Sequence, residues 1–299
     1  MSIALTRLGY EPGTRLLVVH ADDVGMCHAT LPAIRDLFSV GVVTCAATMV
    51  PCPWFPAVAQ YCREHPEADM GVHLTLNCEW STYRWRPVST ADPASGLLDE
   101  EGYMPQSPAR IQADASQDAV AHELSAQLGR ALAAGIDVTH LDSHMGTVFH
   151  PRFARAYISL ALDHELPPFL AAQTPEWIRS NPGFDVDLML QIYEEALAAG
   201  VIPFDNLAML PLDAPEDRVE QAKRAIADLP EGLSLMIIHP AIATPELETI
   251  APDWQARVAD YEAFTSDELA SFVESEDVRL IGYRDLRDAL RRQKSAAKE

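Results

Sequence analysis

The sequence predicts an α/β protein, a distorted (β/α) barrel of about seven or eight parallel strands with helices outside. Short apolar, β-branched runs alternate with helical patterns along the 299 residues, and this order implies a parallel sheet covered by helices. Polar clusters also follow four of the predicted strands, and active sites form at that end of barrel strands. An open, doubly wound sheet is the alternative, but the length and the polar clusters favour the barrel.

The predicted strands are short and rich in aliphatic residues, as the run Leu-Leu-Val-Val-His at residues 16–20 illustrates. They cover residues 16–20, 42–50, 70–76, 138–144, 204–210, 233–239 and 279–283, with a possible strand at 169–173. The predicted helices have apolar residues three or four positions apart, and several end at a glycine. They cover residues 28–40, 55–63, 117–134, 152–164, 187–199, 216–229 and 285–293, with further helix inside 254–274.

Residues 77–116 interrupt this alternation with a long segment that contains Trp80, Tyr83, Trp85 and Tyr103. We expect residues 1–299 to form a single domain in which this segment is an aromatic loop insertion. Long loops without periodicity are usually functional or disordered, and the aromatic residues argue against disorder. Three roles are open: stacking on a sugar ring, covering the mouth of the barrel, or contacting a second subunit in a homodimer.

The composition excludes several classes of partner. There are 22 basic and 44 acidic residues, a formal net charge of −22, which disfavours binding to nucleic acid and to anionic membranes. No apolar run approaches the roughly 18 to 20 residues that cross a bilayer, and residues 1–10 do not resemble a signal peptide. The cysteines have no Cys-x-x-Cys spacing, so we expect reduced thiols in a cytoplasmic protein. They are Cys27, Cys45, Cys52, Cys62 and Cys78.

The first polar cluster contains Asp22 and Asp23, directly after the strand at residues 16–20. Adjacent carboxylates at a strand end repel each other and lose hydration, and a metal ion or a shared proton would relieve that cost. The alternative is a solvated turn or a helix N-cap. The second cluster centres on His73, which alternation places on one face of its strand with Gly71 and Thr75. A core histidine bonded to the backbone is the alternative there.

The strongest local signal is the third cluster, Thr139-His-Leu-Asp-Ser-His144. His140, Asp142 and His144 stand at i, i+2 and i+4 of a strand, so all three side chains share one face. His144 is nearest the carboxyl end and suits a metal ligand, whereas Asp142 and His140 suit residues that orient an imidazole. A purely structural hydrogen-bonded trio is the alternative.

The fourth cluster is His239, which ends a buried strand immediately before Pro240. The alternative to a functional role is a structural histidine that is hydrogen-bonded at the strand end. Taken together, the clusters supply two histidines and one aspartate for a divalent ion with open positions. The remaining aspartate and histidine would act as general base and general acid. Such a site hydrolyses acyl bonds by activating water.

These motifs, in this order, resemble the YdjC-like carbohydrate deacetylases, a family that includes the ChbG and HpnK deacetylases. The resemblance extends from residue 16 to residue 241, and the Thr-His-Leu-Asp-Ser-His element is its most specific part. It implies a barrel-like fold related to polysaccharide deacetylases and a divalent metal that assists removal of an N-acetyl group. The matching runs are His20-Ala-Asp22-Asp23-Val-Gly25, Gly71-Val-His73-Leu-Thr-Leu76, Thr139-His-Leu-Asp-Ser-His144 and His239-Pro240-Ala241.

The resemblance also implies a role for each residue. Asp23, His73 and His144 would hold the metal ion, Asp22 would be the general base and His239 the general acid. Behind them would lie His20, His140 and Asp142. Two histidines with one carboxylate favour Zn²⁺ chemically, and Mg²⁺ is the alternative.

Two departures from the family pattern concern the surroundings of the site. His20 stands where the family usually has asparagine, and residues 145–151 lack a further His-x-His before the proline. Neither change affects the expected ligands, but both leave the identity of the sugar open. We therefore expect a hydrolase that releases acetate from a small acetylated substrate, most simply a sugar. The alternatives are a metal-dependent amidase or esterase acting on a non-sugar acyl group, and a barrel that binds a ligand without turnover.

Overall fold

The computed structural model describes residues 2–172, 174–180 and 185–296. Within these residues, seven strands form one sheet in the order β4-β3-β2-β1-β6-β5, with β7 also paired to β1. Every pair of neighbouring strands is parallel, which confirms the predicted α/β class. The strands are β1 (Arg15–Val24), β2 (Cys45–Thr48), β3 (Met70–Leu74), β4 (Val138–Ser143), β5 (Asn206–Met209), β6 (Gly232–Ile238) and β7 (Arg279–Leu280).

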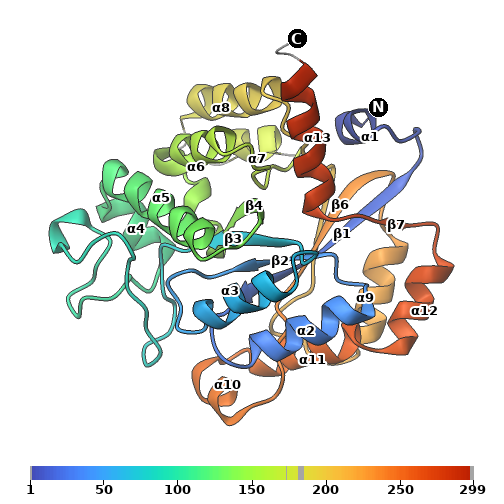
Figure 1. Ribbon diagram of the computed structural model, residues 1–299, viewed down its shortest axis with the longest axis horizontal. Helices are drawn as coiled ribbons and strands as arrows, with labels where there is room; N and C mark the ends of the chain where they lie inside the picture. The colour runs from blue at the N-terminus through green and yellow to red at the C-terminus, as the bar shows by residue number, and fades with distance from the viewer. Residues whose placement is uncertain (1, 173, 181–184, 297–299) are drawn as a thin grey trace.

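Helices surround these strands (Figure 1). Several begin at a serine, threonine or aspartate whose side chain accepts a backbone N–H, as Ser116 does at α5. The helices are α1 (Ile3–Leu8), α2 (Thr30–Val40), α3 (Phe55–Glu64), α4 (Pro108–Asp114), α5 (Gln117–Ala133), α6 (Pro151–Asp163), α7 (Thr174–Ser180), α8 (Val186–Ala198), α9 (Arg218–Ala227), α10 (Pro245–Ile250), α11 (Trp254–Phe264), α12 (Asp267–Ser275) and α13 (Tyr283–Ala296), with 3₁₀ turns η1 (Pro93–Ser95) and η2 (His144–Phe149). Within the described residues, no helix is long and apolar enough to span a membrane.

Residues 167–172 bridge the two edge strands and close the barrel. Phe169 N donates to Leu141 O of β4 at 2.9 Å, and Phe204 N, just before β5, donates to Leu170 O at 2.8 Å. The predicted strand at 169–173 is therefore only a bridging segment as far as residue 172, and Gln173 lies outside the described residues. Pro167 and Pro168 lack backbone N–H groups, which prevents a full ladder on this side.

Alternate residues of β1 face two separate apolar cores. Leu17 and Val19 pack against the helices outside the barrel. Leu16 and Val18 point inside it, where Tyr283 at the start of α13 also packs. Residues of α1 belong to the same inner core, so α1 and α13 close the amino-terminal end of the barrel. The open end is therefore the one at which the strands have their carboxyl ends.

Several predicted boundaries differ from the structure. The strand predicted at 42–50 is limited to β2, and the one at 279–283 to β7, because α13 begins at Tyr283. The helical region 254–274 is divided into α11 and α12 by Ser266, whose side chain caps α12 by accepting Leu269 N. The short helices α1, α4, α7 and α10 are absent from the sequence-based assignment.

The long loop between β3 and α5 covers one side of the barrel mouth, at the left of Figure 1. Trp80 is 8% exposed and Trp85 3% exposed, and both pack in a third apolar core with Met26 and Met49. Tyr83 OH donates to Met26 O at 2.7 Å, which ties the loop to the end of β1. Of the three roles expected for the aromatic residues, stacking on sugar does not suit these two buried tryptophans.

Candidate active site

A bulge at the end of β1 directs two adjacent carboxylates into the barrel mouth. Neighbouring side chains on a regular strand point to opposite faces. Here Asp23 has a φ of 62°, and the pairing with β2 shifts register between Ala21 and Val24. As a result, Asp22 Oδ2 lies 3.7 Å and Asp23 Oδ1 3.4 Å from the same atom, His73 Nε2. Left-handed backbone at a non-glycine residue is strained and is concentrated at functional sites.

Three buried side chains from three strand ends converge on one point. Asp23 Oδ1 lies 3.1 Å from His144 Nδ1 and 3.4 Å from His73 Nε2. One ligand atom from each of the three lies within 4.8 Å of the others. Donors held about 2.0–2.1 Å from a tetrahedral zinc ion lie roughly 3.3 Å apart, so the spacing fits a shared cation.

Each of these histidines presents its other ring nitrogen to a carboxylate. His73 Nδ1 donates to Asp142 Oδ1 at 2.9 Å, and His144 Nε2 donates to Glu79 Oε2 at 2.8 Å. These bonds leave His73 Nε2 and His144 Nδ1 facing Asp23. A carboxylate behind a histidine fixes the orientation and tautomer of the ring, as in histidine ligands of metal ions.

The second oxygen of Asp23 is already occupied. Buried Arg257, from α11, places Nη1 2.8 Å from Asp23 Oδ2 and also binds Asp253 through Nε and Nη2. Burial alone would raise the pKa of Asp23, but Arg257 and His144 hold it well below its usual range. Asp23 is therefore ionised, with Oδ1 directed toward the two histidines.

Asp22 lies between two histidines on the opposite side of the cluster. Its Oδ1 is 2.7 Å from His20 Nδ1, and its Oδ2 is 3.7 Å from His239 Nε2. Burial would raise the pKa of Asp22, but the charges of His73, His20 and His239 lower it below its usual value. The backbone N–H of His239 donates to Asp260 Oδ2 at 2.9 Å, which fixes the end of β6.

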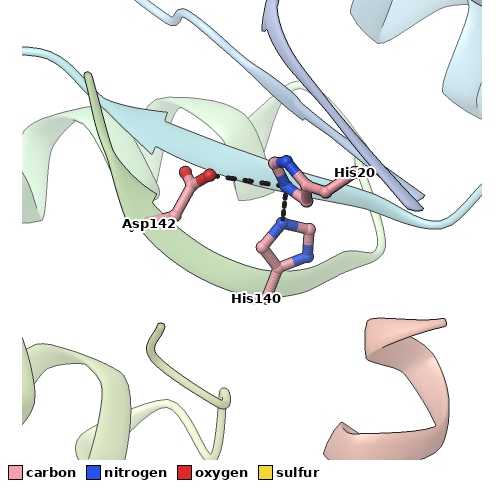
Figure 2. Close-up of side chains that lie close together, drawn as sticks. All are labelled: His20, His140 and Asp142. Carbon is pink, nitrogen blue, oxygen red and sulfur yellow. Dashed lines mark hydrogen bonds and ion pairs between the residues drawn. The ribbon is translucent and has the colours of Figure 1, made fainter. Parts of the chain in front are cut away.

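Behind Asp22, a second cluster joins β1 to β4 (Figure 2). His20 Nε2 lies 2.8 Å from His140 Nε2 and 3.4 Å from Asp142 Oδ2. Thr139 Oγ1 lies 2.9 Å from His140 Nδ1, and the Tyr283 ring stacks on His140 at 3.7 Å. Every ring nitrogen of the two histidines thus already has a close polar neighbour.

The two histidines of this second cluster have opposite pKa shifts. Burial and the charges of His20 and His73 lower the pKa of His140 well below its usual value. Burial would also lower the pKa of His20, but the hydrogen bond and charge of Asp22, with Asp142, raise it. The bond between His20 Nε2 and His140 Nε2 therefore joins a ring of raised pKa to one of lowered pKa. A metal ion could also fit His20, His140 and Asp142 geometrically, but His20 Nε2 already bonds to His140 Nε2 and Asp142 Oδ1 already accepts from His73.

The cluster of Asp23, His73 and His144 also suits a cation electrostatically. Burial would lower the pKa of both histidines, but surrounding carboxylates raise it, to about 9 for His144 and well above the usual value for His73. The group thus attracts positive charge strongly, and a divalent ion would replace the protons. The donor set of two imidazoles and one carboxylate is of a kind that binds divalent transition metals.

Comparison with known proteins bears out the resemblance seen in the sequence. A model of the YdjC-like protein family matches residues 16–275. The chain belongs to the YdjC-like protein family. A relative from Thermus thermophilus, named carbohydrate deacetylase, is 35% identical over 266 residues, which are 89% of this chain and 91% of the relative. One with the same name from Thermoanaerobacter pseudethanolicus is 24% identical over 269 residues, or 90% and 98% of the two chains.

A solved structure supports the fold. It belongs to an Enterococcus faecalis protein named for a proposed cleavage of cellobiose phosphate. That structure has a TM-score of 0.72 and 22% identity, and the similarity covers 91% of this chain and 99% of the other. At this identity the likeness concerns architecture alone, and it agrees with the barrel-like arrangement of strands and helices in this YdjC-like chain.

The structure brings the site residues predicted from the sequence into one connected group at the open end of the barrel. Sequence reasoning missed Glu79, Arg257 and Tyr283, which contact members of this group. Glu79 lies in the loop without periodicity, and Arg257 lies on α11. A buried arginine has no distinct pattern in a single sequence, so the contact of Arg257 depends on the tertiary fold.

Proposed function

We propose that the protein is a divalent-metal-dependent deacetylase that removes the N-acetyl group from an acetylated sugar or oligosaccharide and releases acetate. The observation that carries the proposal is the convergence of Asp23, His73 and His144, with Asp22 and His239 beside them, at the barrel mouth. Two relatives are named carbohydrate deacetylases, which supports the choice of substrate.

In this proposal, Asp23, His73 and His144 hold one divalent ion, with Zn²⁺ preferred to Mg²⁺ on the chemistry of the donors. When bound, the ion supplies positive charge that polarises the acetamide carbonyl and makes the attacking water more acidic. Arg257 keeps Asp23 ionised and oriented. Asp142 and Glu79 hold the two imidazoles in the orientation that points toward Asp23.

Two groups beside the ligands would move the protons. Asp22, ionised because of the neighbouring histidines, takes the proton from the attacking water. His239 lies 3.7 Å from Asp22 and donates a proton to the nitrogen of the leaving amino sugar. The buried pair of His20 and His140 keeps the Asp22 carboxylate in place, because His20 Nδ1 contacts its Oδ1 at 2.7 Å.

The test measures acetate release and metal content together. Protein stripped with a chelator should be inactive on N-acetylglucosamine oligomers and should regain activity when Zn²⁺ or another divalent ion is added. A parallel series of non-sugar acetamides and acetate esters examines the alternative acyl substrates. Turnover that is undiminished in the stripped protein would contradict metal dependence, and turnover of the non-sugar series alone would contradict the sugar substrate.

Substitutions distinguish the proposed metal ligands from the residues that would move protons. We expect His73→Ala and His144→Ala to lose both tight metal binding and activity, because each removes one of three ligands. Asp22→Asn should keep metal affinity within about threefold but lose about 100-fold or more in kcat, as expected for a general base. A fully active Asp22→Asn variant, or a His73→Ala variant with undiminished metal content, would contradict the assignment.

A further inference from the structure

His73 and His144 are each held by a carboxylate, and the two carboxylates come from different parts of the chain. Asp142, which binds His73, belongs to β4 and to the sequence motif that defines the site. Glu79, which binds His144 at 2.8 Å, belongs to the loop after β3, and 21% of its side chain is exposed. The sequence gives no reason to place Glu79 in the site, and the proposed chemistry does not require it to touch substrate.

We propose that Glu79 is a positioning residue for His144, so that the loop after β3 forms a structural part of the metal site. The inference rests on the proposed function, because it assumes that His144 is a ligand. A carboxylate behind a ligating imidazole raises its basicity and fixes which nitrogen faces the ion. With Nε2 bonded to Glu79, His144 offers Nδ1, the nitrogen that lies 3.1 Å from Asp23 Oδ1.

The loop around Glu79 is anchored firmly enough for such a role. Asn77 Oδ1 accepts a hydrogen bond from Thr147 Oγ1 at 2.7 Å, and Asn77 O accepts one from Trp85 Nε1 at 3.0 Å. The ring of Trp85 lies 6.2 Å from the ring of His144, edge to face. Contacts on both sides of Glu79 therefore connect the loop to the turn that follows His144, and its carboxylate is positioned by fixed backbone.

The charge of Glu79 also acts on His144. Its Oε2 lies 2.8 Å from Nε2 of the imidazole, and only 21% of the Glu79 side chain is exposed. The same negative charge would stabilise a cation bound at Nδ1, since opposite charges attract more strongly in a site shielded from water. Removing this carboxylate should therefore weaken metal binding without changing any of the three ligands.

The experiment measures the Zn²⁺ affinity of chelator-stripped protein by competition with a chromophoric chelator. The variants are Glu79→Gln, which keeps the size of the side chain, Glu79→Ala and Glu79→Asp. Glu101→Gln is the matched control, since Glu101 is an exposed carboxylate of the same loop, 3.4 Å from Arg84. Asp142→Asn is the parallel change behind His73. Melting temperatures of the stripped proteins verify that each variant folds. If Glu79→Gln or Glu79→Ala does not fold, the comparison uses Glu79→Asp instead.

We expect Glu79→Gln to bind Zn²⁺ about 10-fold more weakly and Glu79→Ala up to about 100-fold more weakly. Glu79→Asp should bind more tightly than Glu79→Gln, and Glu101→Gln should match the wild type. A role in packing alone would leave Glu79→Gln unchanged. Wild-type affinity in Glu79→Gln, or equal losses in Glu79→Gln and Glu101→Gln, would overturn the inference and leave the proposed function intact. A wild-type protein that binds no divalent ion would overturn both.

Discussion

Gly71 is the residue whose lack of a side chain shapes the cluster of His20, His140 and Asp142. The ring of His140 lies directly over its α-carbon, and a Cβ at this position would overlap Nε2, Cε1 and Cδ2 of that ring. On its other face His140 stacks on Tyr283. The imidazole is therefore confined between a strand and an aromatic ring, and this confinement sets the position of His20.

We expect Gly71→Ala to destabilise the protein by about 1–3 kcal/mol, the usual cost of overpacking a core. Displacement of His140 should also lower kcat, because His20 would lose the position from which it contacts Asp22. Thermal unfolding and acetate release measure the two effects. Gly129→Ala is the control, since an alanine there meets nothing within 4 Å and should stabilise α5 by up to about 1 kcal/mol. A Gly71→Ala protein as stable as the wild type would contradict this packing.

Individual residues were predictable where a regular pattern reaches the site. Alternation along β4 places His140 and Asp142 on one face, where both approach His20, and His144 directly after the strand reaches Asp23. Alternation along β3 separates His73, which bonds to Asp142, from Val72 and Leu74 in the outer core. Alternation fails at Asp22 and Asp23, because a bulge with left-handed backbone at Asp23 interrupts the regular pattern of β1. No pattern in the sequence indicates that kink, so only the nature of the two side chains pointed to a site.

At the scale of elements, helix α13 is attached to the start of β4 by a small charged group. Asp137 accepts from Arg284 Nη1 at 2.6 Å and from Arg287 Nη1 at 2.7 Å. Arg287 also donates to Val138 O at 3.1 Å. Burial would raise the pKa of Asp137, but the two arginines hold it below its usual value. The ionised form of Asp137 therefore stabilises the docking of α13.

We expect Asp137→Asn to lower the free energy of unfolding by about 0.5–1 kcal/mol at pH 7, a modest loss because 53% of the Asp137 side chain is exposed. Since the folded pKa lies below the unfolded one, the stabilisation is complete above about pH 4 and disappears as the pH falls through the folded pKa. Urea unfolding at pH 7 and pH 3 measures the difference. Glu231→Gln, at an exposed position, is the control. An equal loss in the free energy of unfolding of Asp137→Asn at both pH values would contradict stabilisation by the ion pairs.

Most strands and long helices were predictable because their apolar periodicity coincides with burial. The segment at 167–172 was not, because its apolar composition suits a strand while its two prolines prevent a ladder. The short helices α1 and α10 contain only six residues each, too few for periodicity to distinguish them from loops. Their positions follow from caps and tertiary contacts rather than from a repeating pattern.

For the whole molecule, the net charge of −22 has a consequence for substrate choice. Acidic residues surround the proposed ligands as well, and a negatively charged protein repels anionic substrates over roughly a Debye length. The proposed product, an amino sugar, would be cationic and the proposed substrate neutral. Both are compatible with this charge, whereas a phosphorylated sugar would approach less readily.

We therefore predict that a neutral N-acetyl sugar has a several-fold higher kcat/KM than its phosphate ester at low ionic strength. Added salt should reduce this difference in kcat/KM, because screening weakens the repulsion of the ester and leaves the neutral sugar unaffected. Steady-state kinetics at about 20 mM and 300 mM salt compare the two. A higher kcat/KM for the phosphate ester would contradict the role given to charge. A preference for the neutral sugar that does not change with salt would contradict it as well.

The proposed function requires that Asp23, His73 and His144 together hold one divalent ion. The most direct measurement is anomalous diffraction at the zinc edge from crystals of the Zn²⁺-loaded protein. We predict a peak in contact with Asp23 Oδ1, His73 Nε2 and His144 Nδ1, with His144 Nε2 still bonded to Glu79. An ion bound instead by His20, His140 and Asp142, or no peak beside Asp23, would contradict it.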